Sequence, residues 1–359
     1  MSEKLTVRSI YRDYDLYFID DVSGLLRSER VRKDRFWVID ARLADLYKDK
    51  FSEILTTDHV ITIEATENNK TIDYCQQLIK KLVEKNIRKN SVLVAIGGGI
   101  LQDITAFIAS VLFRGIEWEF FPTTLLAQAD SCIGSKTSVN LGQYKNLLGS
   151  FCPPSNIYID VGFLETLPRG EIKSGIGEIL HFYLISDSIL LEEMMNAYDE
   201  LVASPRRLKP YIVESLRIKK RVIEVDEFDK HDRNLFNYGH TFGHAIETVS
   251  DYRINHGQAV TMGMDIANYV SLRLGNLDEA DFFYMHRILE QNMPIFKLEA
   301  ENMDNYFLAL SKDKKNTGDN LVCILTTGPG SMRKAVLALD EKLRNIIAEY
   351  FKFPIVERV

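Results

Sequence analysis

The chain has few cysteines and no long uncharged apolar run. Its 359 residues include four cysteines, Cys75, Cys132, Cys152 and Cys323, which lie too far apart for a metal-type pair or for the dense disulfide framework of a small secreted protein. We therefore expect reduced thiols. Residues 1–8 include charged side chains and lack the apolar segment of a signal peptide. No uncharged apolar run approaches the roughly eighteen residues that a membrane span needs. These absences predict a cytoplasmic protein with no membrane partner.

The sequence also lacks an excess of positive charge. The formal net charge is -7, so the protein as a whole does not attract nucleic acid or anionic lipid, and we expect no nucleic-acid partner. An anionic substrate would have to be held by local basic residues. Hydrophobic residues make up 46% and charged residues 26% of the chain, a composition typical of a folded globular protein. The length suits two domains, and there is no internal repeat.

The first half of the chain alternates apolar, β-rich runs with segments of helical periodicity. The runs cover residues 36–40, 59–64, 91–96, 118–121 and 156–160. This rhythm predicts a Rossmann-like parallel sheet with helices on both faces, forming an N-terminal α/β nucleotide-binding domain over residues 1–168. From about residue 171 the pattern is mostly helical, with a short strand pair expected near residues 321–325 and 334–337. Residues 169–359 are therefore predicted to form a mainly α-helical metal- and substrate-binding domain.

A glycine-rich turn at residues 97–103 follows one of the predicted strands and opens an amphipathic helix. It does not have the GxGxxG spacing. Glycines at such a junction let a diphosphate approach the backbone amides at the helix N-terminus, where the helix dipole favours negative charge. Residues 121–130 and 134–146 add hydroxyls and lysines after another strand end, where open α/β sheets bind ligands. Together these segments predict a site for a phosphorylated ligand.

Three of the seven histidines are closely grouped in the sequence of the second half. His240 and His244 lie one helical turn apart, and His256 follows after a short interval. With the isolated Glu178, they have the donor types of a catalytic Zn²⁺ site that keeps one position open for substrate. Because residues at i and i+4 share a helical face, both His240 and His244 could bind metal, or one could bind metal while the other carries protons.

With these motifs assembled, the chain resembles the 3-dehydroquinate synthase family and its wider group, the sugar phosphate cyclases. The resemblance extends over nearly the whole length, and its most specific segments are residues 97–103, 114–115, 122–127, 134–146, 177–178 and 239–247. It implies a dehydroquinate synthase-like fold, a homodimer in which Arg114 lies near the partner's site, and a phosphorylated sugar or keto-acid substrate.

The resemblance also implies two cofactors. It implies Zn²⁺ or Co²⁺ on Glu178, His240 and His256. It implies NAD⁺ bound by Asp40, Glu67, Lys70, Gly98, Gly99, Asp103, Thr123, Thr124, Lys136, Lys145, Phe163 and Thr166. The substrate would meet Arg114, Asp130, Lys136, Asn146, Lys219, Arg233, Asn237, His244 and Lys314, although the neighbouring Lys315 is an alternative to Lys314.

Two positions depart from the family pattern. The family has a lysine three residues after the metal glutamate, where this chain has His181, and a glutamate where it has Gln258. The first change removes a permanent positive charge from a helical face shared with Glu178. Three interpretations of His181 are open: it contacts the same substrate hydroxyl, joins the metal as an extra ligand, or marks a different substrate. We favour a changed substrate contact.

The family chemistry is an internal redox cycle in which NAD⁺ oxidises a hydroxyl, phosphate is eliminated, the hydride returns and an aldol step closes a carbocycle. The favoured function is conversion of 3-deoxy-arabino-heptulosonate 7-phosphate to 3-dehydroquinate, and Arg233 and Asn237 support it. His181 favours a sister cyclase that makes a valiolone- or deoxyinosose-type cyclitol from sedoheptulose 7-phosphate or a hexose phosphate. A metal-dependent polyol dehydrogenase, which would accumulate NADH, and a non-catalytic scaffold protein are further alternatives.

Overall fold

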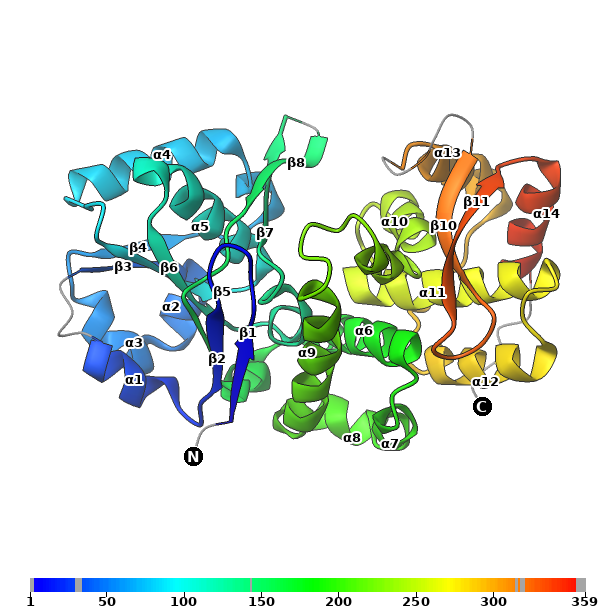
Figure 1. The fold of residues 1–359 in the computed structure, drawn as a ribbon, viewed down its shortest axis with the longest axis horizontal. Helices are drawn as coiled ribbons and strands as arrows, with labels where there is room; N and C mark the ends of the chain where they lie inside the picture. Colours follow the sequence, from blue (N-terminus) through cyan, green and yellow to red (C-terminus); the bar gives the residue numbers. More distant parts are fainter. Residues whose placement is uncertain (1–2, 30–33, 143, 314–315, 317–319, 353–359) are drawn as a thin grey trace. The chain divides into compact units, whose positions relative to one another are not determined.

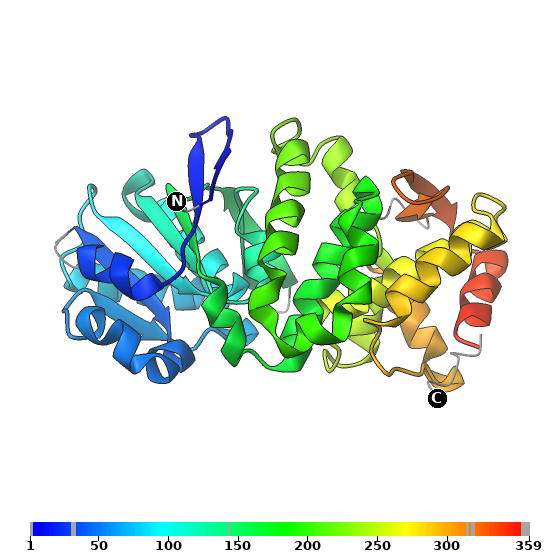
Figure 2. The same ribbon diagram turned by 90° about the horizontal axis from the view of Figure 1, so that it is seen from below.

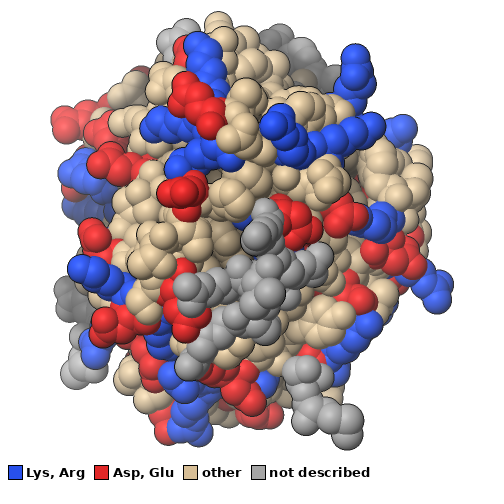
Figure 3. All heavy atoms as spheres, turned by 90° about the vertical axis from the view of Figure 1, so that its left-hand side faces the viewer, with Lys and Arg blue, Asp and Glu red and all other residues tan. Residues whose placement is uncertain are grey.

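The computed structural model describes residues 3–29, 34–142, 144–313, 316 and 320–352, and the chain divides into two compact units. The first unit comprises Met1–Leu167 and Pro205–Phe228, and the second comprises Pro168–Ser204 and Asp229–Val359 (Figure 1). Within the described residues, no helix combines the length and the apolarity that crossing a lipid bilayer requires. Acidic and basic side chains are interspersed over the face shown in Figure 3.

A seven-stranded sheet in the order β1-β2-β9-β6-β5-β3-β4 forms the centre of the first unit. Its strands are β1 (Lys4–Val7), β2 (Tyr14–Phe18), β3 (Arg35–Asp40), β4 (Val60–Ile63), β5 (Val92–Gly97), β6 (Glu117–Pro122) and β9 (Asn156–Ile159). Neighbouring strands are parallel from β2 to β4, whereas β1 is antiparallel to β2, and these two form the hairpin that projects in Figure 2. Every residue of β5 is buried, as expected for a central parallel strand.

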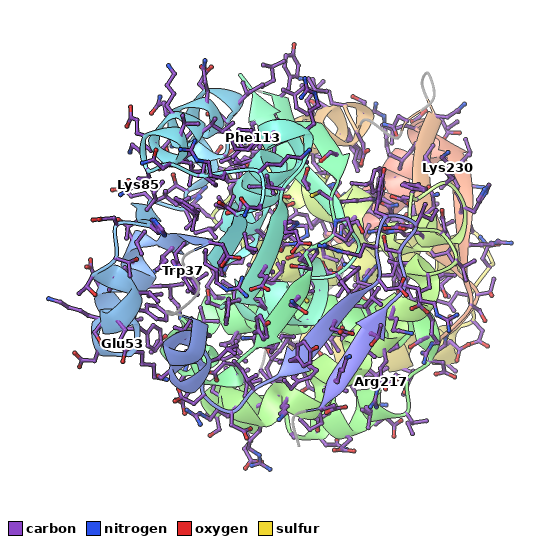
Figure 4. All side chains as sticks on the ribbon, turned by 60° about the vertical axis from the view of Figure 1, so that its left-hand side comes forward. Trp37, Glu53, Lys85, Phe113, Arg217 and Lys230 are labelled. Carbon is purple, nitrogen blue, oxygen red and sulfur yellow. The ribbon has the colours of Figure 1, made fainter. Side chains whose placement is uncertain are left out.

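Helices cover both faces of this sheet (Figure 1). Their bounds are α1 (Val22–Glu29), α2 (Ala41–Leu46), α3 (Lys48–Leu55), α4 (Ile72–Glu84) and α5 (Gly99–Val111). Trp37, labelled in Figure 4, packs with Val94 and Phe121 in a core that α1, α2 and α3 complete. α5 packs against β5 and β6, and α4 packs against α5. The predicted helix-covered parallel sheet is therefore confirmed.

Shorter elements complete the first unit. They are the 3₁₀ helices η1 (Glu67–Asn69), η2 (Leu112–Arg114), η4 (Val161–Thr166) and η5 (Pro205–Leu208), the π-helix η3 (Ala127–Ser131), the hairpin of β7 (Lys136–Leu141) and β8 (Tyr144–Phe151), and α9 (Lys209–Ile223). The hairpin is a separate antiparallel sheet beside α5. These elements carry several of the candidate ligand-binding residues.

Residues 205–228 pack with the first unit, whereas sequence analysis placed them in a domain of residues 169–359. Ser215 on α9 donates a hydrogen bond to the Ala129 carbonyl oxygen at 2.8 Å. The buried Glu227 accepts hydrogen bonds from the hydroxyls of Ser9 and Ser135, both at 2.7 Å. Helical periodicity identifies α9 as a helix with one apolar face, but it does not tell which unit covers that face.

The second unit is built around α11 (His256–Arg273). This helix packs against α6, α10, α12, α14 and β10. The elements of the unit are α6 (Arg169–Ser186), α7 (Leu190–Asn196), α8 (Tyr198–Ala203), η6 (Asp232–Asn237), α10 (His240–Val249), α12 (Glu279–Glu290), η7 (Ala300–Asn302), α13 (Met303–Ser311), α14 (Glu341–Tyr350) and the antiparallel pair β10 (Asn320–Thr326) and β11 (Met332–Ala338). A mainly helical unit with one short strand pair matches the expectation for this region.

Glycines let α6, α10 and α11 approach each other backbone to backbone. A Cβ atom at Gly177 on α6 would overlap the carbonyl oxygen of Gly257 on α11, and one at Gly257 would overlap the carbonyl oxygen of Ser174. A Cβ atom at Gly243 on α10 would lie 2.9 Å from the carbonyl oxygen of Ala259. No larger residue fits at these crossings without moving a helix.

Sequence analysis missed two strand pairs. β1 is a short edge strand, and β2 is a short strand between β1 and β9. β8 exposes most of its side chains, so its sequence lacks the apolar alternation of a half-buried strand. The five predicted strands of the main sheet and the pair β10–β11 are all present. The hydrophobic pattern therefore identified the central strands of the main sheet and missed the exposed β8, but it also missed β2, whose alternate side chains are buried.

We expect Gly177→Ala to destabilise the protein by about 3 kcal/mol, the upper part of the usual range for adding a methyl group to a packed interior, because the Cβ atom meets backbone rather than a movable side chain. Denaturant unfolding of the variant measures this. Gly24→Ala on α1 is the matched control: no atom lies within 4 Å of a Cβ there. Its expected effect is neutral or stabilising by about 0.5–1 kcal/mol. Equal stability of Gly177→Ala and the wild type would contradict the close helix crossing.

Candidate active site

A carboxylate and two imidazoles converge in the second unit. Glu178 lies on α6, His240 begins α10 and His256 begins α11. One possible ligand atom from each of the three lies within 4.8 Å of the others. Such nitrogen and oxygen donors suit Zn²⁺ or Co²⁺, and a set of three leaves a coordination position open. These are the three residues that the resemblance implied as metal ligands.

His256 lies between two carboxylates. Its Nε2 is 3.3 Å from Glu178 Oε1, and its Nδ1 is 3.3 Å from Glu247 Oε1. A carboxylate at the second ring nitrogen is a common partner of a metal-binding histidine, because it fixes the tautomer and directs the other nitrogen at the ion. Burial lowers the pKa of His256, but Glu178 and Glu247 outweigh burial and hold it well above its ordinary value. Sequence analysis assigned no role to Glu247.

His240 is oriented by the backbone. Its Nδ1 lies 3.1 Å from the carbonyl oxygen of Tyr238, which leaves Nε2 for another partner. The Tyr238 side chain is itself buried and donates a short hydrogen bond to Asn268. Burial holds the pKa of His240 well below its ordinary value. The ring is therefore neutral, which is the state in which imidazole binds a metal.

The environment of Glu178 fits a bound cation. Its Oε1 is fully buried and lies 3.3 Å from His256 Nε2. Burial raises the pKa of this carboxyl, but the contact with His256 outweighs burial and holds it well below its usual range, so the group is ionised. A buried ionised oxygen is costly unless a positive charge lies beside it, such as a proton on His256 or a metal ion. A divalent ion held by the three residues would provide that charge.

His181, the departure from the family pattern, is 1% exposed. Its Nδ1 lies 4.0 Å from Glu178 Oε2, and its ring centroid lies 5.1 Å from the centroids of Phe182 and His240. It belongs to neither of the two groups of donor atoms that converge within the described residues. The extra-ligand interpretation therefore has no geometric support. At this exposure the ring also offers a substrate very little surface.

Three further candidate residues of the second unit lie on α10 and η6. His244 is exposed, and its ring centroid is 5.5 Å from that of His240. Arg233 is buried on η6, which packs against α6. Asn237 is half-buried and donates through Nδ2 to the Asn234 carbonyl oxygen at 2.9 Å. Of the three, His244 is the one whose ring lies beside the candidate metal ligands.

In the first unit, the glycine turn joins β5 to α5. Gly98 is the N-cap residue of α5, and a Cβ atom there would lie 2.9 Å from Thr124 Cγ2. The Thr123 amide donates to the Gly97 carbonyl oxygen at 3.0 Å, which joins this turn to the end of β6. Backbone N–H groups at the first turn of a helix are the usual partners of a diphosphate. The turn thus has the geometry that sequence analysis expected.

A second polar cluster lies beside this turn. We call Lys70, Asp103, Ser138 and Asn146 the Lys70 cluster. Lys70 Nζ lies 2.5 Å from Asp103 Oδ2 and 2.8 Å from Asn146 Oδ1. The Ser138 amide donates to Asp103 Oδ1 at 2.9 Å. Four residues from separate segments of the first unit therefore form one hydrogen-bonded network, and three of them were candidates from sequence.

Asn140 links Glu67, another cofactor candidate, to the Lys70 cluster. Its Nδ2 donates to Glu67 Oε1 at 2.8 Å, and its Oδ1 accepts from the Asn146 amide at 2.8 Å. Sequence analysis singled out neither Asn140 nor Ser138, although both lie in the polar segment 134–146 that it selected. The alternation of polar side chains along β7 was the signal that would have identified them.

Asp130 and Lys219 form a buried ion pair in the first unit. Lys219 Nζ lies 2.7 Å from Asp130 Oδ1 and 2.7 Å from the Asp130 backbone oxygen. From sequence, Lys219 could equally have been a surface charge on its helix; the structure buries it. Lys136 and Lys145, by contrast, are exposed on the β7–β8 hairpin. The exposed lysines of the hairpin and the paired Lys219 are therefore two separate groups of basic residues.

Other cofactor candidates follow the carboxyl ends of neighbouring parallel strands, where open α/β sheets bind ligands. Asp40 ends β3, and its Oδ1 accepts a hydrogen bond from the Arg42 amide at 3.0 Å. Burial raises the pKa of Asp40. Thr166 Oγ1 lies 2.7 Å from the hydroxyl of Tyr47, a residue not singled out from sequence, and Phe163 packs edge-on against the Tyr47 ring.

The structure also answers the sequence expectations for the last two candidate positions, for Gln258 and for the cysteines. Lys314 and Lys315 lie outside the described residues. Arg114 is exposed on η2. Gln258 donates through Nε2 to the Asn292 carbonyl oxygen at 3.2 Å, a contact within the helical core. All four cysteines are free, as expected, and burial raises the pKa of Cys132 to about 12, so this thiol is not a nucleophile.

A Rossmann-like unit with a glycine turn and a helical unit with a Glu-His-His donor set define a class of enzymes that combine a nucleotide cofactor with a metal. Family models described as the N-terminal and C-terminal parts of 3-dehydroquinate synthase match residues 60–174 and 175–316. The 3-dehydroquinate synthase of Thermoanaerobacter sp. (strain X514) is 33% identical over 350 residues, covering 95% of this chain and 98% of the relative. The chain belongs to the 3-dehydroquinate synthase family.

Two solved structures show the same fold. A 2-deoxy-scyllo-inosose synthase complexed with carbaglucose-6-phosphate, NAD⁺ and Co²⁺ has a TM-score of 0.85 and 26% identity, over 97% of this chain and 100% of that chain. The 2-epi-5-epi-valiolone synthase of Streptomyces hygroscopicus subsp. jinggangensis 5008, with NAD⁺ and Zn²⁺ bound, has a TM-score of 0.81 and 24% identity, over 94% and 96%. The fold expected from sequence, an α/β nucleotide domain with a helical domain, is confirmed.

We expect His240→Ala to lower the affinity for zinc by more than about 100-fold, since loss of even an outer partner of a ligand costs about 10–100-fold. Dialysis against a weak chelator followed by metal analysis measures the zinc that remains. His231→Ala is the matched control, because His231 is an exposed histidine outside both groups of converging donors. Normal zinc content in His240→Ala, with the fold intact by circular dichroism, would refute the assignment.

Proposed function

We propose that the protein is a 3-dehydroquinate synthase, which converts 3-deoxy-arabino-heptulosonate 7-phosphate to 3-dehydroquinate and phosphate. The observation that carries this proposal is the convergence of Glu178, His240 and His256, in which Glu178 is a buried, ionised carboxylate. A relative of that name at 33% identity over 95% of the chain gives independent support. The substrate class that follows is a phosphorylated sugar acid.

The first unit would bind NAD⁺. The glycine turn before α5 offers helix N-terminal amides to the diphosphate, and Asp40, at the end of β3, is a natural partner for ribose hydroxyls. Both of the related structures described above contain NAD⁺. The other residues that we propose for this site are Glu67, Lys70, Asp103, Thr123, Thr124, Lys136, Lys145, Phe163 and Thr166. NAD⁺ supplies the hydride acceptor and donor for a reaction without net oxidation.

The second unit would hold the metal. Glu178, His240 and His256 supply one oxygen and two nitrogen donors, and Glu247 and the Tyr238 carbonyl orient the two rings. When bound, Zn²⁺ or Co²⁺ supplies a Lewis acid that lowers the pKa of a coordinated hydroxyl. The related structures contain Co²⁺ in one case and Zn²⁺ in the other.

Proton transfer is the work that this chain's own side chains would do. Loss of phosphate requires removal of a proton from the carbon next to the oxidised position, and ring closure requires a proton to be returned. His244 is exposed beside His240 and is suited to this role, together with the phosphate of the substrate itself. His244 thus carries protons in this proposal and does not bind the catalytic ion.

Fixed positive charges would hold the anionic groups of the substrate. Lys219 is buried and oriented by Asp130, so its ammonium group is held in one position before a ligand arrives. The further substrate contacts that we propose are Arg114, Lys136, Asn146, Arg233, Asn237 and Lys314. A keto-acid phosphate carries two anionic groups and therefore needs more than one such contact.

A sister cyclase that uses sedoheptulose 7-phosphate or a hexose phosphate is the second candidate. The observation that favours it is His181, which replaces the family lysine and has almost no exposed surface. The fold likeness to a 2-deoxy-scyllo-inosose synthase agrees with either candidate. A metal-dependent polyol dehydrogenase is the third, and it differs by releasing NADH.

We expect the zinc-loaded enzyme with NAD⁺ to release phosphate from 3-deoxy-arabino-heptulosonate 7-phosphate without accumulating NADH. A phosphate assay run in parallel with sedoheptulose 7-phosphate, while absorbance follows NADH, measures both quantities. The His240→Ala enzyme is the inactive control. Release from the neutral ketose alone would identify a sister cyclase, and NADH build-up would identify a dehydrogenase.

The same assay with His181→Lys distinguishes the interpretations of that residue. If His181 determines the substrate, the lysine variant shifts the ratio of phosphate release between the two substrates toward the heptulosonate. An unchanged ratio would mean that the replacement is incidental to specificity.

We further propose a homodimer in which Arg114 reaches the active site of the partner subunit. Phe113, Arg114 and Gly115 all have positive φ values, 51°, 66° and 112°. For a bulky residue such as Phe113 this conformation is strained, and strain of this kind is typical of functional segments. Phe113, labelled in Figure 4, is 40% exposed and Val111 is 49% exposed. A partner subunit would cover this apolar surface beside Arg114.

A mixture of two inactive variants tests the shared site. Arg114→Ala and His240→Ala should each be inactive alone. In a mixed dimer, the chain with intact His240 receives intact Arg114 from its partner, so one functional site forms. Random mixing should restore about a quarter of wild-type activity, because about half of the dimers are mixed and each has one of two sites. No recovery after subunit exchange, shown by mass-tagged chains, would contradict the proposal.

A further inference from the structure

The second unit contains a second group of converging donor atoms. His244 and Glu247 on α10 and His256 at the start of α11 place one possible ligand atom each within 4.8 Å of the others. This group shares His256 with the candidate catalytic set. The proposed function uses His244 for protons and Glu247 to orient His256, and it assigns neither of them to a metal.

The carboxylates of the two groups contact opposite nitrogens of the His256 ring. His256 Nε2 lies 3.3 Å from Glu178 Oε1, and Nδ1 lies 3.3 Å from Glu247 Oε1. Two donors on a tetrahedral zinc ion are separated by about 3.3 Å, given bonds of about 2.0–2.1 Å. Both pairs therefore already have the spacing of ligands on a common ion. The third donor residue, His244, has its ring 5.8 Å from that of His256 between centroids.

The two groups differ in access. Glu178 is buried, whereas His244 is exposed and Glu247 is partly exposed. The first group therefore forms the inner position of the cluster, and the second faces solvent. Nitrogen and carboxylate donors suit the same divalent transition metals in both places.

We propose that His244, Glu247 and His256 form an outer site for a second Zn²⁺ or Co²⁺ ion, and that an ion there inhibits the enzyme. This inference rests on the proposed function, in which the inner ion is catalytic and His244 carries protons. An ion bound to His244 occupies the nitrogen lone pair that proton transfer needs. Excess metal would then slow turnover without removing the catalytic ion.

The outer ion binds more weakly than the inner one. The donors of the outer site are closer to water, so solvent screens the attraction between these donors and the ion. The outer ion must also displace the proton between Glu247 and His256 Nδ1. That proton leaves to solvent when the ion binds.

Equilibrium dialysis against zinc, with metal analysis, tests the proposal on the full chain. The wild type should bind one ion per chain at micromolar zinc and a second at millimolar zinc. His244→Ala should keep the first ion and lose the second, so its content should stay at one. His231→Ala, an exposed histidine outside both groups, should bind two, as the wild type does.

A second measurement distinguishes a specific site from surface binding. With Co²⁺ in place of zinc, the second equivalent should change the visible absorption of the wild type and leave that of His244→Ala unchanged, because the bands depend on the ligands and geometry that a built site imposes on the ion. A second equivalent that persists in His244→Ala is an adventitious ion and overturns the proposal. So does a wild type that stops at one ion.

The outcomes also separate this inference from the proposed function. A single tight ion that disappears in His240→Ala would leave the catalytic site standing and refute the outer site alone. If the wild type bound no zinc at either concentration, both the outer site and the catalytic metal site would be refuted.

Discussion

The candidate site depends on how closely three helices of the second unit approach each other. Where α6, α10 and α11 cross, backbone meets backbone, and only glycine leaves room. Three of the glycines at these contacts are sequence neighbours of a candidate ligand. The pairs are Gly177–Glu178, Gly239–His240 and His256–Gly257. The requirement for close packing and the requirement for converging donors are therefore met by the same short segments.

This arrangement explains why the donors converge without long side chains bridging the gap. At a helix separation set by side-chain packing, about 8–10 Å between axes, a carboxylate and two imidazoles would need to extend toward each other from separate surfaces. Glycine crossings shorten that distance, and Gly239 adds a left-handed turn, with φ of 78°, immediately before His240. A Cβ atom at Gly239 would lie 2.7 Å from the Val260 carbonyl oxygen, so this turn too is fixed by packing.

Much of the site could be predicted from sequence because its signals are local. His240 and His244 are one helical turn apart, and the glycines of residues 97–103 stand between a strand and a helix, so periodicity alone places them. The contacts of Lys219 could not be predicted in this way. Its partner Asp130 lies far away in the sequence, and no helical pattern of α9 tells which unit that helix joins.

Glu247 was missed for a related reason. As a carboxylate on a helix at the end of the histidine motif, it has the sequence signature of an ordinary solvated side chain. Its role becomes visible only when α10 and α11 are brought together and its Oε1 lies beside His256 Nδ1. Sequence patterns identify residues that bind directly, whereas residues that orient them are recognised by contact.

The candidate ligand-binding lysines Lys70 and Lys219 of the first unit already contact carboxylates of the same unit, and a ligand must compete with these contacts. In the Lys70 cluster the ammonium group contacts Asp103 and Asn146, and Lys219 contacts Asp130. A ligand that enters must exchange these contacts for its own, so each new hydrogen bond adds only a small net free energy. A ligand that offers a charge to the cation but nothing to the released carboxylate leaves a half-satisfied network. We therefore expect the first unit to favour molecules that carry both anionic groups and hydroxyl donors, the two features that a nucleotide and a sugar phosphate have in common.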